Sequence, residues 1–465
     1  MKKITYIVLA MLAGAGLVAC NTSLSPSGEE DVRGINVPYN FDFSTTGSVN
    51  FTVKAASQNA ADMNRGRISV FDAHPDQGGR RLATYFLNDS GELAIEHSLP
   101  THLKSVFILP DHPAAEPVQI QVRNGVVQYE YNLPQVAGRG LDAGNAGIAA
   151  GLMDDPAGTV RNVFPAEDAF GTIMFEDLWP SFGDYDMNDL VIGYQFSELT
   201  NEDNNILSID MIFQIRATGT AVKAGFGIQF DDLVPDDIAQ VVGTRLSDGS
   251  FIALNPNGNG TEAGQSRAVV IAFDDANQNF PRMGNVFAER TERTPDEVAL
   301  TVTFENPVSR EVLGNAPYNP FAFFHGTKNV IVDGDTTAVP YGGRGQEVHL
   351  PDHVPTDLVF DELFGQYEDN SLAGMFYKST NVARVGDNMN FAISVPELIP
   401  HAIQKARFAS AIDGEEHAYL RFARWAETDG EENSDWYLDL PGYRNPDVLF
   451  GTADEDIDPE PEPED

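Results

Sequence analysis

The sequence predicts a mainly β protein: an N-terminal β-sandwich, followed by a larger antiparallel β domain with a short helical insertion near the C-terminus. Two observations support this fold class. Short apolar runs with strand-like alternation recur along the chain, and clusters of Gly, Asn, Asp and Pro separate them without an intervening helical period. The 465 residues also include 29 Phe, 14 Tyr and 3 Trp, enough aromatic side chains for a large core.

The β-sandwich is expected over residues 36–134. Two of its runs, Val49–Val53 and Val118–Val122, alternate between apolar and polar residues, as strands with one buried face do. Turn clusters such as Asn88–Gly91 break the runs at intervals of roughly 10–15 residues, which favours an antiparallel sandwich. We interpret the Gly-, Ala- and Asp-rich stretch at 135–165 as a linker.

The larger domain is expected over residues 166–448. It begins with two predicted strands, Gly171–Leu178 and Leu190–Phe196, which an acidic turn connects, and further strands such as Ile206–Arg216 follow. Near the C-terminus, the segment Glu415–Glu427 has aromatic residues on one helical face and predicts a helix. A second short helix is expected at 396–410. The aromatic residues of the helical face are Tyr419, Phe422 and Trp425.

The N-terminal residues 1–19 indicate a cleaved lipoprotein signal peptide. Two lysines precede an apolar run, Ile4–Val18, of about 15 residues, which is too short to span a bilayer core comfortably. The run ends in Leu-Val-Ala-Cys at 17–20, which resembles the lipobox of bacterial lipoproteins. The resemblance implies cleavage before Cys20 and multiple acylation of that residue, which gives a stable membrane anchor. An ordinary secretory signal with a chance cysteine is the alternative.

Residues 20–35 are the expected lipidated tether, because they are polar and rich in turn-forming residues. By analogy with lipoproteins, Asn21 favours the outer membrane and leaves open whether the protein faces the periplasm or the exterior. Cys20 is the only cysteine, so no internal disulfide can form. We therefore place the protein in the cell envelope and expect its stability to come from core burial, helped by metal.

Acidic residues dominate the charge of the chain. Seventy Asp and Glu against 29 Lys and Arg give a net charge of −41. Such a field attracts cations and repels nucleic acid, which we exclude as a partner. Part of the excess lies in the proline-interrupted tail at 449–465, which is expected to be disordered. A general adaptation for solubility or salt tolerance is the alternative explanation.

The connection between the first two strands of the larger domain concentrates carboxylates. Carboxylates about 5 Å apart repel each other by roughly 1 kcal/mol even at the dielectric constant of water, and a hard divalent cation removes that cost. Calcium accepts roughly six to eight oxygen ligands, and a D-x-D-x-N spacing can turn successive side chains toward one ion. The predicted Ca2+ ligands are Asp184, Asp186, Asn188, Asp189, Glu176 and Asp177.

This predicted site departs from the calcium loop of helix–loop–helix proteins. Counting from Asp184, that loop requires Gly where this chain has Asp189, and a bidentate Glu where it has Gln195. Magnesium fits less well because it retains its waters and requires a tighter octahedron. A metal-free acidic turn held by Asx hydrogen bonds is the alternative.

The block from Phe175 to Val191 reads FEDLWPSFGDYDMNDLV and resembles the signature of the LruC domain family of bacterial surface lipoproteins. The chain departs from that family near Asn390, where the family often has Pro-Trp. The resemblance implies a surface-exposed lipoprotein and defines no biochemical activity. Further stretches similar to the family are Asn319–Phe321, Gln346–Pro351, Pro355–Asp357, Phe422–Ala426 and Asp435–Tyr437, and Val37–Thr45 is similar to the domain that precedes it.

No other motif in the sequence points to catalysis. The chain has no G-x-S-x-G nucleophile elbow and no H-E-x-x-H zinc motif. His349 and His353, with Asp352, are candidates for a transition-metal site, and a turn with ordinary hydrogen bonds is the alternative. We therefore expect a membrane-anchored, Ca2+-stabilised module that is not an enzyme and that binds extracellular matrix, glycan or another envelope protein. The alternatives are a hydrolase of surface polysaccharide and a purely structural envelope component.

Overall fold

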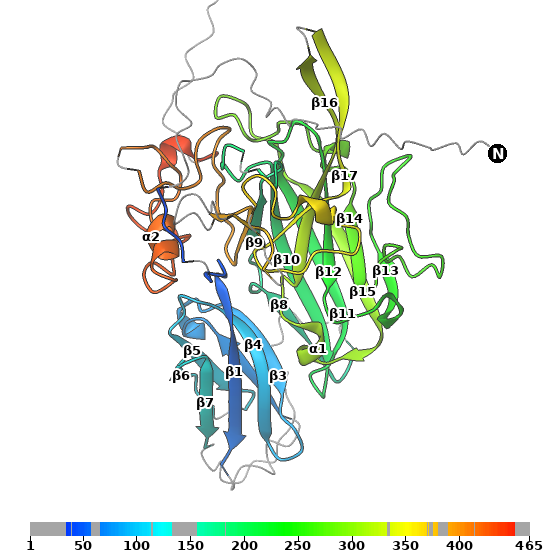
Figure 1. Cartoon of the computed structure of the whole chain (residues 1–465). Helices are drawn as coiled ribbons and strands as arrows, with labels where there is room; N and C mark the ends of the chain where they lie inside the picture. Colours follow the sequence, from blue (N-terminus) through cyan, green and yellow to red (C-terminus); the bar gives the residue numbers. More distant parts are fainter. Residues whose placement is uncertain are drawn as a thin grey trace, which may run out of the picture.

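The computed structural model describes residues 34–451, apart from 39, 57–65, 113–114, 133–155, 182, 333–334, 370, 372–374, 380–388 and 413. The predicted signal peptide, Cys20, most of the linker and the acidic tail beyond 451 lie outside the described residues. Within them the protein is mainly β, with several antiparallel sheets and very little helix, as the sequence predicts (Figure 1). No helix in this part of the chain is long and apolar enough to cross a membrane.

Two sheets form the predicted N-terminal β-sandwich (Figure 1). One has the strand order β4-β1-β7 and the other β3-β2-β5-β6, and β1 pairs with β7 in parallel while the other neighbours are antiparallel. Buried side chains from both sheets, such as Phe51 and Tyr85, meet in one hydrophobic cluster. The strands are β1 (Thr46–Ala55), β2 (Arg67–Phe71), β3 (Arg81–Phe86), β4 (Glu92–Pro100), β5 (Ser105–Pro110), β6 (Val118–Gln121) and β7 (Val126–Tyr131).

The larger domain contains a seven-stranded and a four-stranded sheet. The first has the order β13-β15-β11-β10-β9-β20, with β8 also paired to β10, and the second has the order β14-β12-β16-β17. Strands β16 and β17 pair along a long hairpin, from Phe321 with His349 to Val332 with Asp335 (Figure 1). Strand β8 belongs to the stretch that we interpreted as a linker, so the end of that stretch is part of a sheet. The strands are β8 (Thr159–Phe164), β9 (Gly171–Phe175), β10 (Leu190–Asn201), β11 (Ile206–Ala217), β12 (Lys223–Phe230), β13 (Ile238–Val242), β14 (Ala268–Phe273), β15 (Asp296–Val308), β16 (Asn319–Val332), β17 (Asp335–His349), β18 (Lys378–Ser379), β19 (Met389–Asn390) and β20 (Ala392–Val395).

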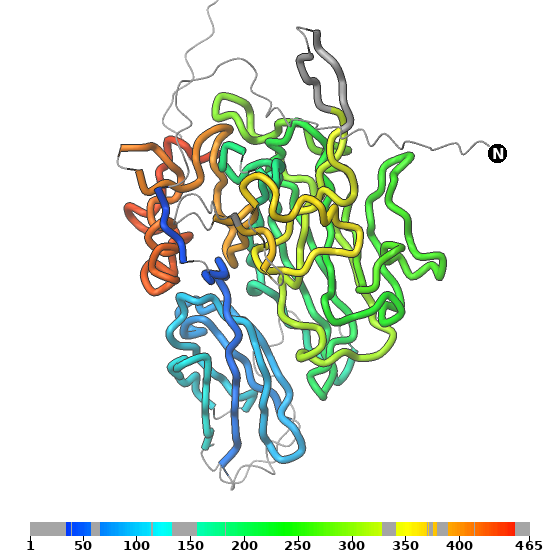
Figure 2. Tube along the Cα trace, viewed as in Figure 1, coloured from blue at the N-terminus to red at the C-terminus, as the bar shows by residue number. Residues whose placement is uncertain are grey.

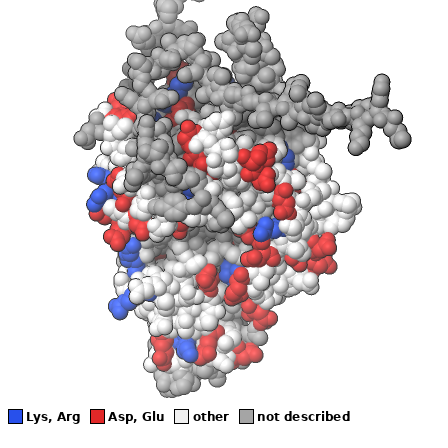
Figure 3. Space-filling view, viewed as in Figure 1, with Lys and Arg blue, Asp and Glu red and all other residues white. Residues whose placement is uncertain are grey.

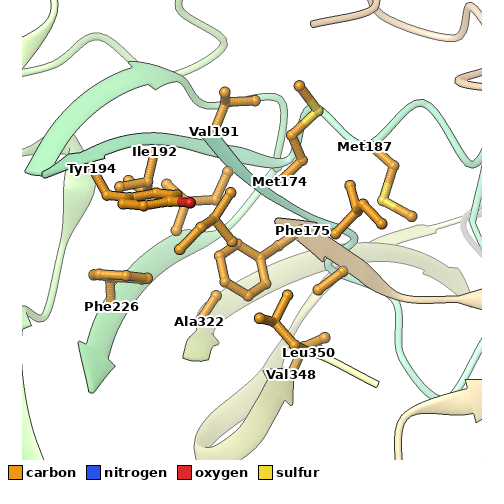
Figure 4. Close-up of a cluster of buried hydrophobic side chains, with 14 of the residues drawn as sticks. Met174, Phe175, Met187, Val191, Ile192, Tyr194, Phe226, Ala322, Val348 and Leu350 are labelled. Carbon is orange, nitrogen blue, oxygen red and sulfur yellow. The ribbon is translucent and has the colours of Figure 1, made fainter. Parts of the chain in front are cut away.

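Aromatic and aliphatic side chains pack together between the two sheets of the larger domain (Figure 4). The ring centroids of Phe213 on β11 and Phe226 on β12 are 4.9 Å apart, and Phe175 on β9 lies 6.1 Å from Phe226. Large aromatic residues contribute much of the burial that stabilises such a core. Met187, from the acidic turn after β9, is fully buried in the same cluster. The turn is therefore fixed to the core by its own apolar side chain.

A mostly irregular C-terminal region, residues 396–450, lies beside the sheets (Figure 1). The predicted helix at 396–410 is wrong: Pro396 and Pro400 have no backbone N–H to donate, and the Phe408 N–H bonds to the distant Tyr185 carbonyl instead. The predicted helix over Glu415–Glu427 forms only in its last part. The α-helices among the described residues are α1 (Arg310–Leu313) and α2 (Phe422–Glu427), and the 3-10 helices are η1 (Pro75–Gln77), η2 (Pro235–Asp237), η3 (Ala276–Gln278), η4 (Asp361–Leu363) and η5 (Pro446–Val448).

Five aromatic residues of this region are buried against one another, and we call them the aromatic cap. Residues 34–38 and 40–45, which we call the N-terminal strap, lie against the aromatic cap (Figure 2). The ring of Phe41 is 4.8 Å from Trp425, and Phe43 stacks on Phe422 at 6.2 Å. The strap was expected to belong to the tether and the sandwich, but it packs into the core of the larger domain. The aromatic cap consists of Phe408, Tyr419, Phe422, Trp425 and Trp436.

Candidate cation site

The acidic turn connects β9 to β10, and the pairing of these strands brings its two ends together. Phe175 pairs with Leu190, so the turn starts and finishes at the same edge of the hairpin. Tyr185 and Met187 have left-handed backbone conformations, with φ of 55° and 54°. Such conformations cost non-glycine residues on the order of 1 kcal/mol each. Both side chains are fully buried, and their packing offsets this cost.

The turn gathers three carboxylates. Oxygen atoms of Glu176, Asp184 and Asp186 lie within 4.8 Å of one another, and they form the one such group of potential metal ligands among the described residues. Glu176 and Asp186 are fully buried, whereas Asp184 is exposed. The group therefore has a buried base and one side that is open to solvent.

The two oxygens of the Glu176 carboxylate differ in their contacts. Oε1 accepts a hydrogen bond from the Met187 N–H at 2.7 Å, whereas Oε2 is buried and has no hydrogen-bond partner. Gly183, at φ 70°, allows this arrangement, because a Cβ there would lie 3.0 Å from Oε2. A buried carboxylate oxygen without a partner is costly. A cation shared with the neighbouring carboxylates would satisfy it.

The electrostatics of the turn favour a bound cation. Burial raises the pKa of the Glu176 carboxyl well above its usual range, and the charges of Asp186 and Asp184 raise it further. Burial and the charge of Asp184 raise the pKa of Asp186 in the same way. Backbone N–H donors from Lys405 at 2.8 Å and Asn188 at 3.2 Å partly oppose the shift at Asp186. A divalent cation stabilises the charged carboxylates and lowers these pKa values.

Asp177 and Asp189 lie beside the three carboxylates but are engaged in other contacts. Asp189 Oδ2 accepts from the Asp177 N–H at 2.7 Å, and Asp177 Oδ2 accepts from the Thr220 hydroxyl at 2.5 Å. Asn188 donates its amide to the Ala402 carbonyl at 3.1 Å, and its Oδ1 atom is buried without a partner. The structure thus places the six predicted ligands in one turn and brings three of them close enough to share one ion.

Two groups of the site come from segments that the sequence does not link to the turn. The Lys405 N–H bonds to Asp186 across 219 residues of sequence, and the Thr220 hydroxyl reaches Asp177 from the segment after β11. Lys405 acts through its main chain, which any residue except proline could supply. No local pattern marks such a contact.

Acidic side chains also outnumber basic ones over the visible face of the molecule (Figure 3). Acidic side chains are therefore spread over this face of the molecule in addition to those gathered at the turn. A field of this sign raises the local concentration of cations around the protein.

The candidates for a transition-metal site, His349, His353 and Asp352, are buried, half-buried or engaged in other contacts. The His349 ring is buried, contacts the Asn319 amide oxygen through Nδ1 at 2.5 Å, and has Nε2 at 3.3 Å from Glu347. Asp352 forms an ion pair with Lys378. Burial lowers the pKa of His353 to about 4. Among the described residues, these three predicted ligands are not part of any group that meets at one point.

Comparison with known proteins identifies a family whose description names no function. A family model described as a domain of unknown function (DUF4842) matches residues 204–437, about half of the 465-residue chain. The acidic turn precedes this range, whereas Thr220, Ala402 and Lys405 lie within it. No curated protein matches the chain.

Two solved structures show a distant likeness. The crystal structure of a candidate lipoprotein from Bacteroides ovatus is 13% identical over 82% of this chain and 98% of that protein, with a TM-score of 0.45. The shaft pilin SpaA from Lactobacillus rhamnosus GG is 12% identical over 64% of this chain and 93% of the pilin, with a TM-score of 0.14. At these TM-scores the likenesses carry no argument about fold or function.

Proposed function

The chain belongs to the DUF4842 family, whose description names no activity, and we propose that it is a calcium-binding β module of the bacterial cell envelope. The observation that carries the calcium proposal is Glu176 Oε2, which is buried without a hydrogen-bond partner beside Asp184 and Asp186. Calcium accepts roughly six to eight oxygens in a flexible geometry, so three carboxylates with water on the open side suit it. Magnesium retains most of its waters and fits these buried, charged oxygens less well.

The role of the ion in this proposal is structural. The turn joins two adjacent inner strands of the seven-stranded sheet, β9 and β10, and holds Tyr185 and Met187 in left-handed conformations. A cation would remove the repulsion between the carboxylates at this point. Because it binds the folded chain and not the unfolded one, it would stabilise the fold in proportion to its concentration.

Calcium titration of the metal-stripped protein tests this part of the proposal. We expect the unfolding free energy to rise by about 2.7 kcal/mol when calcium reaches a hundred times its Kd. Asp186→Asn should remove most of this calcium-dependent increase in stability. Asp248→Asn changes an exposed aspartate outside the acidic turn and should leave the increase intact. Thermal unfolding with calcium or chelator measures both. A parent protein whose midpoint does not respond to calcium would refute the proposal.

The envelope location in this proposal rests on the sequence. The Leu17–Cys20 motif supports acylation of Cys20, and cleavage there would leave the N-terminal strap, from Gly34 on, close behind the lipid. Fourteen residues (34 − 20) reach at most about 50 Å when extended, so the larger domain would stay near the membrane. Labelling of expressing cells with a palmitate analogue should mark the parent protein and not Cys20→Ser, which should appear in the soluble fraction. Equal labelling of both would exclude this anchor.

We further propose membership of the LruC group and a role in binding. The support for membership is the block Phe175–Val191, which contains the residues of the candidate cation site. The partner in this proposal is extracellular matrix, glycan or another envelope protein. Binding of the purified protein to matrix proteins and glycan arrays, with calcium or chelator, tests the role. Release of reducing ends from surface polysaccharide would favour a hydrolase instead.

A further inference from the structure

The acidic turn contacts one segment of the C-terminal region repeatedly. The Lys405 N–H donates to Asp186 Oδ2 at 2.8 Å, and the Phe408 N–H donates to the Tyr185 carbonyl at 2.8 Å. The Asn188 amide donates to the Ala402 carbonyl at 3.1 Å. Residues 402, 405 and 408 therefore each form a hydrogen bond that holds this segment against the turn.

Asp186 belongs to both the carboxylate group and these contacts. One of its oxygens accepts from the Asn188 N–H within the turn, and the other accepts from Lys405. Hydrogen bonds to an ionised carboxylate are roughly twice as strong as those to a neutral group. A cation bound by Asp186 and Glu176 would fix the position of the Asp186 carboxylate, and with it the oxygen that accepts from the Lys405 N–H of the 402–408 segment.

The segment leads directly into the aromatic cap. Phe408 lies 4.8 Å from Tyr419, 5.1 Å from Phe422 and 5.7 Å from Trp436, measured between ring centroids. The region around these rings has little regular secondary structure, since α2 is six residues long. Isolated backbone hydrogen bonds, such as those from the Ala418 and Tyr419 N–H groups to the Arg407 and Phe408 carbonyls, hold this region together with side-chain packing and its attachments to the turn and the sheets.

The N-terminal strap covers the other side of the aromatic cap. Phe41 contacts Trp425, and the Asn36 N–H donates to Glu427 at 3.1 Å. Figure 2 shows this early segment beside the C-terminal region, drawn in orange. The acidic turn, the 402–408 segment, the aromatic cap and the strap thus form one continuous series of contacts.

We infer that a cation at Glu176, Asp184 and Asp186 acts as a clasp, which fixes the 402–408 segment to the acidic turn and so closes the aromatic cap over the N-terminal strap. This inference rests on the proposed calcium site and assigns it a regulatory consequence. Removal of the ion loosens the cap and the strap, while the N-terminal sandwich, which has its own core, keeps its structure. With the proposed anchor at Cys20, the membrane-proximal part of the protein would then respond to the calcium concentration of the envelope compartment that it faces.

Hydrogen–deuterium exchange of the full chain, with calcium or chelator, tests the clasp. We expect exchange in peptides covering 402–408, the aromatic cap and the strap to be about tenfold faster without calcium, since local opening free energies set exchange rates. Peptides from β1 and β4 of the sandwich should not change. Calorimetry on the same samples measures calcium binding independently.

Glu176→Gln is the informative variant, because Glu176 is a proposed ligand whose side chain has no hydrogen bond to the 402–408 segment. It should bind calcium more weakly and show fast exchange in the cap even with calcium. Glu305→Gln, at an exposed glutamate on β15, should behave like the parent. Calcium binding with unchanged exchange in the cap overturns the clasp and leaves the cation site standing. Failure of calcium to bind overturns both.

Discussion

Replacing Glu176 by glutamine should change stability in opposite directions with and without calcium. Glutamine keeps an oxygen that can accept from the Met187 N–H, and it replaces the unpartnered Oε2 by an amide that can donate to Asp184 or Asp186. Without calcium, the substitution removes one of three mutually repelling charges and should stabilise the fold. With calcium, it removes a charged ligand and should weaken the stabilisation that the ion provides.

The distances in the turn set the size of the effect. Two unit charges separated by up to 4.8 Å repel by about 1 kcal/mol at the dielectric constant of water and by about 3 kcal/mol at an effective value near 20. Protonation limits this cost, because burial already raises the pKa of Glu176. We therefore expect Glu176→Gln to gain about 1–3 kcal/mol in chelator. In saturating calcium, each tenfold loss of calcium affinity lowers the free energy of unfolding by about 1.4 kcal/mol relative to the parent.

The measurement is thermal or denaturant unfolding of the parent, Glu176→Gln and Glu305→Gln. Each protein is unfolded once with chelator and once at a calcium concentration that saturates the parent. Glu305 is exposed on β15 and controls for the loss of one negative charge. The expected pattern is a crossing: Glu176→Gln is more stable than the parent in chelator and less stable in calcium. A variant that is destabilised equally in both conditions would refute the reasoning, because Glu176 would then have an ordinary structural role.

Two predictions concern residues away from the carboxylate group. Burial, with the charge of Arg216, lowers the pKa of His401 from 6.5 to about 4. As the pH falls, the unfolded chain therefore binds a proton at His401 before the folded chain does. The free energy of unfolding should drop by about 3 kcal/mol between pH 6.5 and pH 4. Unfolding titrations of His401→Gln should lack this component, and equal pH slopes in variant and parent would contradict it. Arg310→Met leaves the buried Glu198 without the guanidinium that contacts it at 2.7 Å and should cost about 3–5 kcal/mol in denaturant unfolding. Adding Glu198→Leu should recover most of that loss, and a double variant as unstable as Arg310→Met would count against a buried ion pair.

Local sequence patterns predict the regular parts of this fold. The alternating run Ile206–Arg216 predicts β11 to within one residue of its end, because one face of the strand is buried and the other is not. The density of carboxylates between two strand-like runs likewise predicts the position of the acidic turn. Both signals are local, and both depend on residues adjacent in the chain.

The parts that the sequence does not predict depend on contacts between distant segments. The aromatic stripe of Glu415–Glu427 predicts a long helix, but the Ala418 and Tyr419 N–H groups bond to the carbonyls of Arg407 and Phe408, which ends the helical pattern at that point. The Lys405 N–H reaches Asp186 from the same region. Tertiary pairing of this kind overrides local helical propensity.

A crystal structure of the soluble part of the protein grown with calcium, with anomalous scattering data, tests the central claim most directly. The account predicts a calcium ion at the acidic turn, with Glu176 Oε2 and oxygens of Asp184 and Asp186 among its ligands at roughly 2.3–2.6 Å. An ordered turn at saturating calcium, with a water or a protein donor bonded to Glu176 Oε2 in place of an ion, would contradict it.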